Sequence, residues 1–154
     1  MGRKKSYTPL NVFLNSRLVG QLIREPGGGV SFSYAQNWLE WEYQMPVSLS
    51  LPLQENRYSG APVLAVFDNL LPGSDLIRRR VAERVGAEGV DAFSLLSQIG
   101  RDCIGALQFL PEDQAPQPTS EFTGERIDET QIAAILSDLD AAPLGIRREN
   151  DFRI

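Results

Sequence analysis

The sequence of 154 residues has no histidine and a single cysteine, Cys103. The lack of histidine removes the commonest general base at neutral pH and the commonest metal ligand. A lone cysteine excludes an internal disulfide and a thiol-rich metal site. Because a nucleophilic thiol needs a base and an electropositive setting, we interpret Cys103 as an inert buried side chain.

Lysine and long apolar segments are also scarce. The only lysines are Lys4 and Lys5, near the N-terminus. No apolar run approaches the roughly 20 residues that are needed to cross a bilayer. Residues 1–10 lack the apolar segment of a signal peptide. We therefore expect a cytoplasmic protein without membrane contact, and a mobile tail over residues 1–9.

The chain does contain enough apolar residues for a core. They make up 42% of the sequence, and the net charge is −5. Surfaces that bind nucleic-acid phosphates are usually basic, so we expect no direct contact with nucleic acid. One expected helix nevertheless carries four arginines, which we interpret as a solvated face: Arg78, Arg79, Arg80 and Arg84.

Alternating apolar residues and turn signals predict five strands. They are expected over residues 10–14, 18–23, 30–34, 47–51 and 104–110. The first three form a meander whose first turn is Asn15-Ser16. Gly20 has no side chain to pack, which indicates a bulge or a close backbone approach. The fold class is thus α+β, with a small, mostly antiparallel curved sheet or partial barrel and packed helices.

Helical periodicity predicts the remaining elements. A buried helix is expected over 61–71 with Pro62 in its first turn, a second over 74–85 that ends at Gly86, and a short one over 93–99. An acidic, proline-bearing linker follows over 111–124. The segment 125–154 then holds a further helix, capped by Asp128, and an apolar tail.

Two clusters leave alternatives open. Trp38 and Trp41 are three residues apart, so on a helical turn they share a face. They form either an exposed binding surface or a lid on the sheet, and the lid is favoured because aromatic side chains more often pack a core. Structural roles at turns and helix ends are favoured for four aspartates: Asp68, Asp75, Asp91 and Asp102.

The middle of the chain carries the most specific motifs. FDNLLPGS at 67–74 and DAFSLLSQIGRDCIGAL at 91–107 resemble the N-terminal module of the HipA family of serine/threonine kinase toxins. LVGQL, PVSLSLPL and PLGIRRENDFRI fit in the same order, so the resemblance covers essentially the whole chain, with the module itself over 10–110. We interpret the motif positions as structural or interface residues: Phe67, Asp68, Asn69, Leu70, Leu71, Pro72, Gly100, Arg101, Asp102 and Gly105.

The resemblance implies that this chain is a module that works together with a kinase core. In HipA-like proteins this module forms a β-barrel-like sheet with helices and precedes a kinase core, which holds ATP and Mg²⁺ and all catalytic residues. This sequence has no HRD-like or DFG-like element, so no catalytic or cofactor residue is carried over to it. The family also implies contact with HipB, a DNA-binding antitoxin, in a type II toxin–antitoxin system linked to persistence.

Two forms of the protein fit this resemblance. The chain is either the N-terminal part of a longer kinase toxin or a stand-alone HipS-like subunit that binds and restrains a separate kinase. The first form is favoured because the chain extends to the point where the nucleotide loop would begin. Either form would present helices 61–71 and 74–85 and the tail 144–154 to a kinase core. The tail's candidate docking residues are Ile146, Phe152 and Ile154.

Two rival classes remain. A small hydrolase would need the carboxylates of Asp68 and Asp102 to converge in one pocket, and nothing in the sequence places them together. A scaffold could instead dimerise through an open sheet edge, for which the strand 10–14 is the first candidate.

Overall fold

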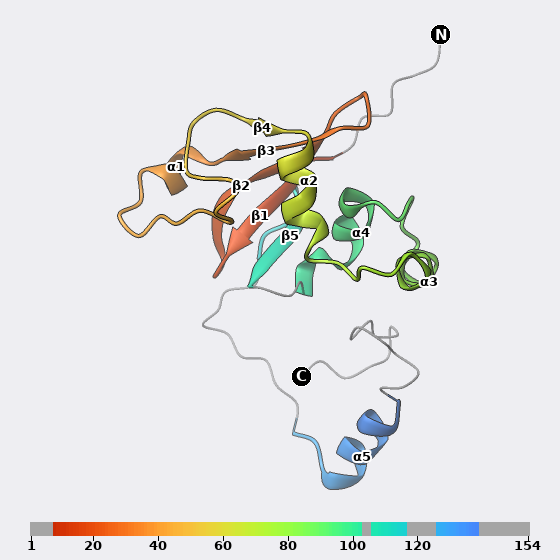
Figure 1. The fold of residues 1–154 in the computed structure, drawn as a ribbon. Coiled ribbons are helices and arrows are strands. Elements are labelled where there is room, and N and C mark those ends of the chain that lie inside the picture. The colour runs from red at the N-terminus through yellow and green to blue at the C-terminus, as the bar shows by residue number, and fades with distance from the viewer. Residues whose placement is uncertain (1–7, 103–105, 117–125, 139–154) are drawn as a thin grey trace. The chain divides into compact units, whose positions relative to one another are not determined.

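The computed structural model describes residues 8–102, 106–116 and 126–138 (Figure 1). The chain divides into two compact units, residues 1–118 and residues 119–154, and each is described by itself. Within the described residues, every helix is too short or too polar to cross a membrane.

The first unit is built on a five-stranded antiparallel sheet. Its strands follow the spatial order β4-β3-β2-β1-β5. They are β1 (Leu10–Leu14), β2 (Arg17–Arg24), β3 (Val30–Tyr34), β4 (Tyr58–Ser59) and β5 (Leu107–Pro111). The predicted meander β1-β2-β3 is confirmed, and β5 pairs with β1 on the side away from β2. The α+β class with five strands and a C-terminal helix is therefore confirmed.

Local backbone chemistry sets the register of this meander. Asn15 and Ser16 both have positive φ, 50° and 63°, as a tight hairpin turn of matching twist requires. The β1–β2 register shifts after Val12, because Val12 pairs with Gly20 but Phe13 with Leu18. A bulge lies there, as expected near Gly20.

Gly20 also meets the second expectation, a close backbone approach. A Cβ atom at this position would lie 2.2 Å from the carbonyl oxygen of Ser33 and 2.9 Å from the ring of Phe32. Only glycine therefore allows β2 and β3 to pair so closely at this point.

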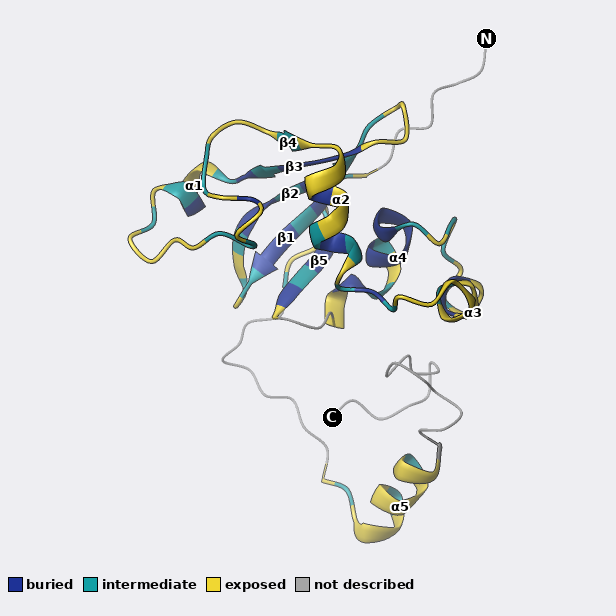
Figure 2. Ribbon diagram, viewed as in Figure 1, coloured by how far each residue is buried: buried dark blue, intermediate teal, exposed yellow. Residues whose placement is uncertain are grey.

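The helices of this unit are short. They are α1 (Gln36–Leu39), α2 (Ala61–Asp68), α3 (Asp75–Val85), α4 (Ala92–Ile99) and the 3-10 turn η1 (Gly100–Asp102). Figures 1 and 2 show α2 and α4 against the sheet with their buried sides toward it, whereas α3 is largely exposed. Buried side chains of β3, α2 and β5 meet in the core through Phe32, Phe67 and Phe109.

Two predicted helix boundaries are correct in physical detail. Pro62 occupies the first turn of α2, where its missing N–H leaves no hydrogen bond unmade. Gly86 ends α3 with a left-handed φ of 67°. The 61–71 helix is, however, neither that long nor buried throughout: α2 ends at Asp68, and Leu64 is 42% exposed.

The predicted fourth strand over 47–51 is wrong. There the chain makes only an isolated bridge between Ser48 and Leu51, and the N–H of Leu51 bonds the carbonyl of Ser48 across a tight turn. The alternation therefore reflects a turn that buries Leu51 and exposes Leu49. The fourth strand is Tyr58–Ser59, which lies between the predicted strand 47–51 and the helix α2.

Helix α5 (Glu129–Asp138) belongs to the second unit. The predicted cap at Asp128 is confirmed, and it is reciprocal. Its carboxylate accepts a bond from the N–H of Gln131 at 2.8 Å, and the Gln131 amide oxygen accepts one from the N–H of Asp128 at 2.8 Å. Two apolar side chains of α5 are exposed: Ile132 at 42% and Leu136 at 60%.

Candidate interaction surface

The two motif segments of the sequence meet on one buried ring. Phe109 of β5 packs edge-on against Phe67 of α2, with ring centroids 5.6 Å apart. Gly100, at the end of α4, belongs to the second motif segment and lies against the same phenylalanine. A Cβ atom at position 100 would fall 2.5 Å from the Cβ of Phe109. A large side chain at 67 and none at 100 are both needed to seat this ring, so these positions hold the helices to the sheet.

A guanidinium closes the junction between α2 and α3. Arg78 donates from Nη1 to Oδ1 of Asp68 at 2.6 Å and from Nη2 to Oδ2 at 3.0 Å. Its Nε also donates to the carbonyl of Pro72 at 2.5 Å. Such a two-pronged arginine–carboxylate pair fixes direction as well as distance. Arg78 thus connects the last residue of α2 to the turn that leads into its own helix.

The electrostatics of this pair follow from its geometry. The hydrogen bonds from Arg78 lower the pKa of the Asp68 carboxyl below its usual 3.8, and partial burial opposes them. The same bonds raise the pKa of Arg78. The Arg78 side chain is 12% exposed and that of Asp68 is 47% exposed, so solvent screens the pair in part.

The other motif residues lie around this junction. Leu71 is buried, Leu70 and Pro72 are half-buried, and Asn69 is exposed. Arg101 and Asp102 are exposed in η1, where Arg101 donates to the amide oxygen of Gln114 at 2.9 Å. Gly105, Cys103 and the candidate docking tail with Ile146, Phe152 and Ile154 lie outside the described residues.

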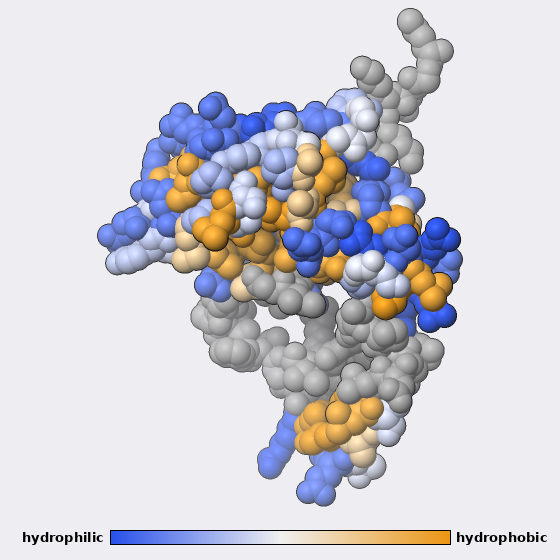
Figure 3. Space-filling view, viewed as in Figure 1, coloured by the Kyte–Doolittle hydropathy of each residue, from blue (hydrophilic) through white to orange (hydrophobic). Residues whose placement is uncertain are grey.

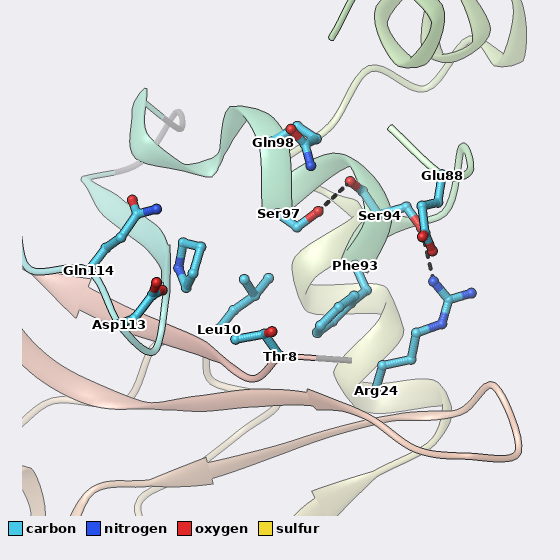
Figure 4. A pocket seen from close by; sticks show the side chains of 11 residues that line it. Thr8, Leu10, Arg24, Glu88, Phe93, Ser94, Ser97, Gln98, Asp113 and Gln114 are labelled. Carbon is cyan, nitrogen blue, oxygen red and sulfur yellow. Dashed lines mark hydrogen bonds between the residues drawn. The ribbon is translucent and has the colours of Figure 1, made fainter. Parts of the chain in front are cut away.

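A hollow lined by both polar and apolar side chains lies between α4 and the adjoining ends of β1 and β5 (Figure 4). Arg24 of β2 reaches into it and donates to the Ser94 hydroxyl at 2.9 Å, and it pairs with the Asp91 carboxylate at 3.4 Å. Asp91 also accepts the Ser94 N–H at 3.1 Å, which caps α4. These polar groups connect β2 to α4, and neither Asp68 nor Asp102 lines the hollow.

The two tryptophans have different environments. Trp38 is 1% exposed and belongs to α1, which lies at one end of the sheet (Figure 1), as the lid interpretation expects. Trp41 is half-buried, with the Arg17 guanidinium 4.3 Å from its ring centroid. Tyr43, whose ring lies 5.6 Å from that of Trp41, is 63% exposed. The cluster therefore begins in the core and ends at the surface.

Sequence reasoning missed two features of this region. It treated Arg78 as part of a solvated arginine face, whereas the Arg78 side chain is mostly buried and is the less exposed member of the Asp68–Arg78 pair. It also missed that Trp38 and Tyr34 bind the backbone of the following loop. The available signal for the first was an aspartate and an arginine on either side of the Pro72-Gly73 break, where a chain reversal can bring the two charges together.

Residues 10–110 match the family described as the HipA N-terminal domain. The chain belongs to this family. The match begins with β1 and ends at residue 110, so it contains all of the sheet except Pro111, both motif segments and the Asp68–Arg78 pair.

Two curated relatives resemble the chain. A protein of Sinorhizobium fredii named "Putative kinase Y4mE" is 36% identical over 138 residues, which are 88% of this chain and 33% of that protein. An uncharacterized protein of Haemophilus influenzae is 30% identical over 104 residues, 67% of this chain and 92% of that protein. The chain thus matches about a third of the first relative and nearly all of the second.

Proposed function

We propose that this chain is a non-catalytic module that packs on the kinase core of a HipA-like serine/threonine kinase and regulates it. The observation that carries the proposal is the coverage of the Sinorhizobium relative: 88% of this chain corresponds to 33% of a protein named as a kinase. On this proposal catalysis, ATP and Mg²⁺ belong to the remaining part of such a protein.

The contacts of Asp68 and Asp91 support a structural rather than a catalytic use of these carboxylates. Asp68 is engaged by Arg78, and Asp91 by Arg24 and the capped N–H of Ser94. A catalytic carboxylate pair needs a cleft in which two such groups act on one bond. The polar groups of the motif segments instead join helix to helix and helix to strand.

The proposal places the protein in a type II toxin–antitoxin system in the cytoplasm. A kinase core is its first partner, and a HipB-like DNA-binding antitoxin is the second. Direct contact of this module with DNA is not part of the proposal, because the chain has a net charge of −5.

Titration calorimetry of the purified chain against its cognate kinase core tests this function. We expect saturable binding at tens of micromolar or tighter, because interfaces of stable complexes bury enough surface for such affinities. The core's ability to bind ATP is checked first, so that a misfolded core is not mistaken for a negative result. No association between the chain and an ATP-binding core would contradict the proposal.

A second candidate function is that of a stand-alone HipS-like subunit that restrains a separate kinase. The Haemophilus relative favours it, since the match covers 92% of that protein and leaves little room there for a kinase core. Reading the coding sequence after the codon for Ile154 separates the two forms. An in-frame continuation into a kinase core supports the first, and a stop codon beside a separate kinase gene supports the second.

A further inference from the structure

The loop of residues 40–51 exposes three large apolar side chains within seven residues. Tyr43 is 63% exposed, Met45 52% and Leu49 94%. Figure 3 shows apolar surface around α2 and the part of this loop that lies beside it, whereas the outer end of the loop is hydrophilic. Scattered exposed apolar residues are ordinary in soluble proteins, but a group on one segment is a mark of an interaction site.

The loop is nevertheless firmly held from inside. The Tyr34 hydroxyl accepts the N–H of Val47 at 3.0 Å and donates to the carbonyl of Leu51 at 2.5 Å. The Trp38 indole donates to the carbonyl of Met45 at 3.1 Å, and Leu51 is fully buried. A partner that binds this loop therefore does not have to order it, which lowers the entropic cost of association.

Charge around the loop has one sign. Residues 36–56 contain three glutamates and no lysine or arginine. Glu40 and Glu42 are exposed beside Tyr43, while the neighbouring cation, Arg17, lies over the ring of Trp41. An apolar group with an acidic rim fits a partner surface that has an apolar pocket edged by lysine or arginine. A second copy of this loop would bring its own glutamates against these.

We propose that the 40–51 loop is the surface by which this module docks on the kinase core, with Leu49 and Tyr43 entering an apolar pocket that basic residues surround. This inference rests on the proposed function and names the surface that performs it. The length of one relative supports the kinase core as the occupant: the Sinorhizobium protein named as a kinase matches 88% of this chain and has about two thirds of its own length outside the match. The inference favours this loop over α3, where the exposed Leu76 has the exposed Arg79 and Arg80 as neighbours.

Matched leucine substitutions test the assignment. Leu49→Ser and Leu76→Ser each remove one exposed leucine, from the loop and from α3, and binding to the ATP-competent kinase core is measured by calorimetry. We expect Leu49→Ser to raise the Kd about tenfold or more, since burying a leucine contributes about that much. Leu76→Ser is expected to leave the Kd within about threefold of the wild type. Urea unfolding of both variants checks that the fold is intact.

A charge reversal gives an independent readout. Glu42→Lys should slow association with the kinase core and weaken its dependence on salt, because it removes part of the acidic rim. Glu83→Lys, on the exposed part of α3, is the matched control and should change neither quantity. An association rate that Glu42→Lys leaves unchanged would contradict the charge argument.

The outcomes separate this inference from the proposed function. If the wild-type chain does not bind the core, the proposed function fails and this inference with it. If the wild type binds and Leu49→Ser binds equally well, or Leu76→Ser has the larger effect, the inference alone fails. Loss of self-association or of antitoxin binding by Leu49→Ser, with kinase binding intact, would assign the loop to that partner and also overturn it.

Discussion

Two irregular segments of this module are fixed in contrasting ways. At the α2–α3 junction, Arg78 binds the carboxylate of Asp68 and the carbonyl of Pro72, so charged groups at the surface satisfy one another. In the 40–51 loop, Tyr34 and Trp38 bind backbone groups from the core side. On the outer side of that loop, Tyr43, Met45 and Leu49 are left exposed.

The contrast shows that a loop can be ordered without burying its own apolar side chains. Buried donors and acceptors bind the backbone from beneath, and each such bond contributes about 1 kcal/mol. The side chains above are then available for another molecule. At the junction the bonds are made instead by one charged side chain, that of Arg78, so the charges of Asp68 and Arg78 satisfy each other.

The largest effect is expected where the junction is attached to the core. Phe67→Ala removes a ring that is 1% exposed and contacts both Phe32 and Phe109. We expect the free energy of unfolding to fall by about 3–5 kcal/mol, as for other buried phenylalanines. Urea unfolding monitored by circular dichroism measures it, and Leu64→Ala, at an exposed position of the same helix, serves as the control. A loss similar to that of the control would show that α2 does not depend on this ring.

The next largest effect is expected from a substitution that removes the guanidinium of Arg78 but keeps its positive charge. Arg78→Lys keeps the charge but cannot make the two-pronged bond to Asp68 or reach Pro72 at the same time. We expect a loss of about 1–2 kcal/mol in the free energy of unfolding, at the lower end for charged hydrogen bonds because Asp68 is half exposed. Arg79→Lys, on the exposed side of α3, should change it by less than about 0.5 kcal/mol. Equal effects of the two substitutions would show that charge alone matters at the junction.

The corresponding change in the loop is Tyr34→Phe. It removes one hydroxyl that bonds both Val47 and Leu51 and leaves the ring in place. We expect a loss of about 1 kcal/mol and faster hydrogen exchange at the Val47 amide, while the amide of Leu22 in the sheet keeps its protection. Unchanged exchange at Val47 would mean that the hydroxyl does not hold the loop.

The smallest effect is the pH dependence of the junction. The pKa of Asp68 is lower in the folded chain than its ordinary 3.8, so the folded state binds fewer protons and this contribution to stability is complete above pH 3.8. It is lost as the pH falls through the lower, folded-state pKa. We therefore expect wild type to exceed Asp68→Asn in stability at pH 7 and the difference to shrink below about pH 4. Unfolding of both proteins at several pH values measures it, and a constant difference would contradict the pairing.

Much of the fold follows from local sequence. The Asn15-Ser16 turn, Gly20, Pro62, Gly86 and the Asp128 cap each have a backbone requirement that few other residues meet, so the sequence shows them directly. The fourth strand was misplaced because Val47 to Leu51 alternates like a strand. Its backbone is bound by the Tyr34 hydroxyl and an internal turn, which no periodicity reveals. The true β4 has two residues and no period to detect.

Less of the candidate surface could be predicted from the sequence. The motif positions were visible, but their common contact with Phe109 depends on how α2, α4 and β5 pack. Likewise, the exposure of Leu49 and the burial of Leu51 follow from one turn and not from their shared residue type. That Phe67 to Pro72 and Gly100 to Asp102 act at an interface stays a prediction.

Kinase activity tests the central claim, that this module binds and regulates a HipA-like kinase core, most directly. The rate of autophosphorylation of the ATP-binding core is measured against increasing concentrations of the chain, wild type and Leu49→Ser in parallel. The account predicts a saturable change in rate with the wild type, and a curve shifted to about tenfold higher concentration with the variant. A rate that stays constant at every concentration of the wild-type chain would contradict it.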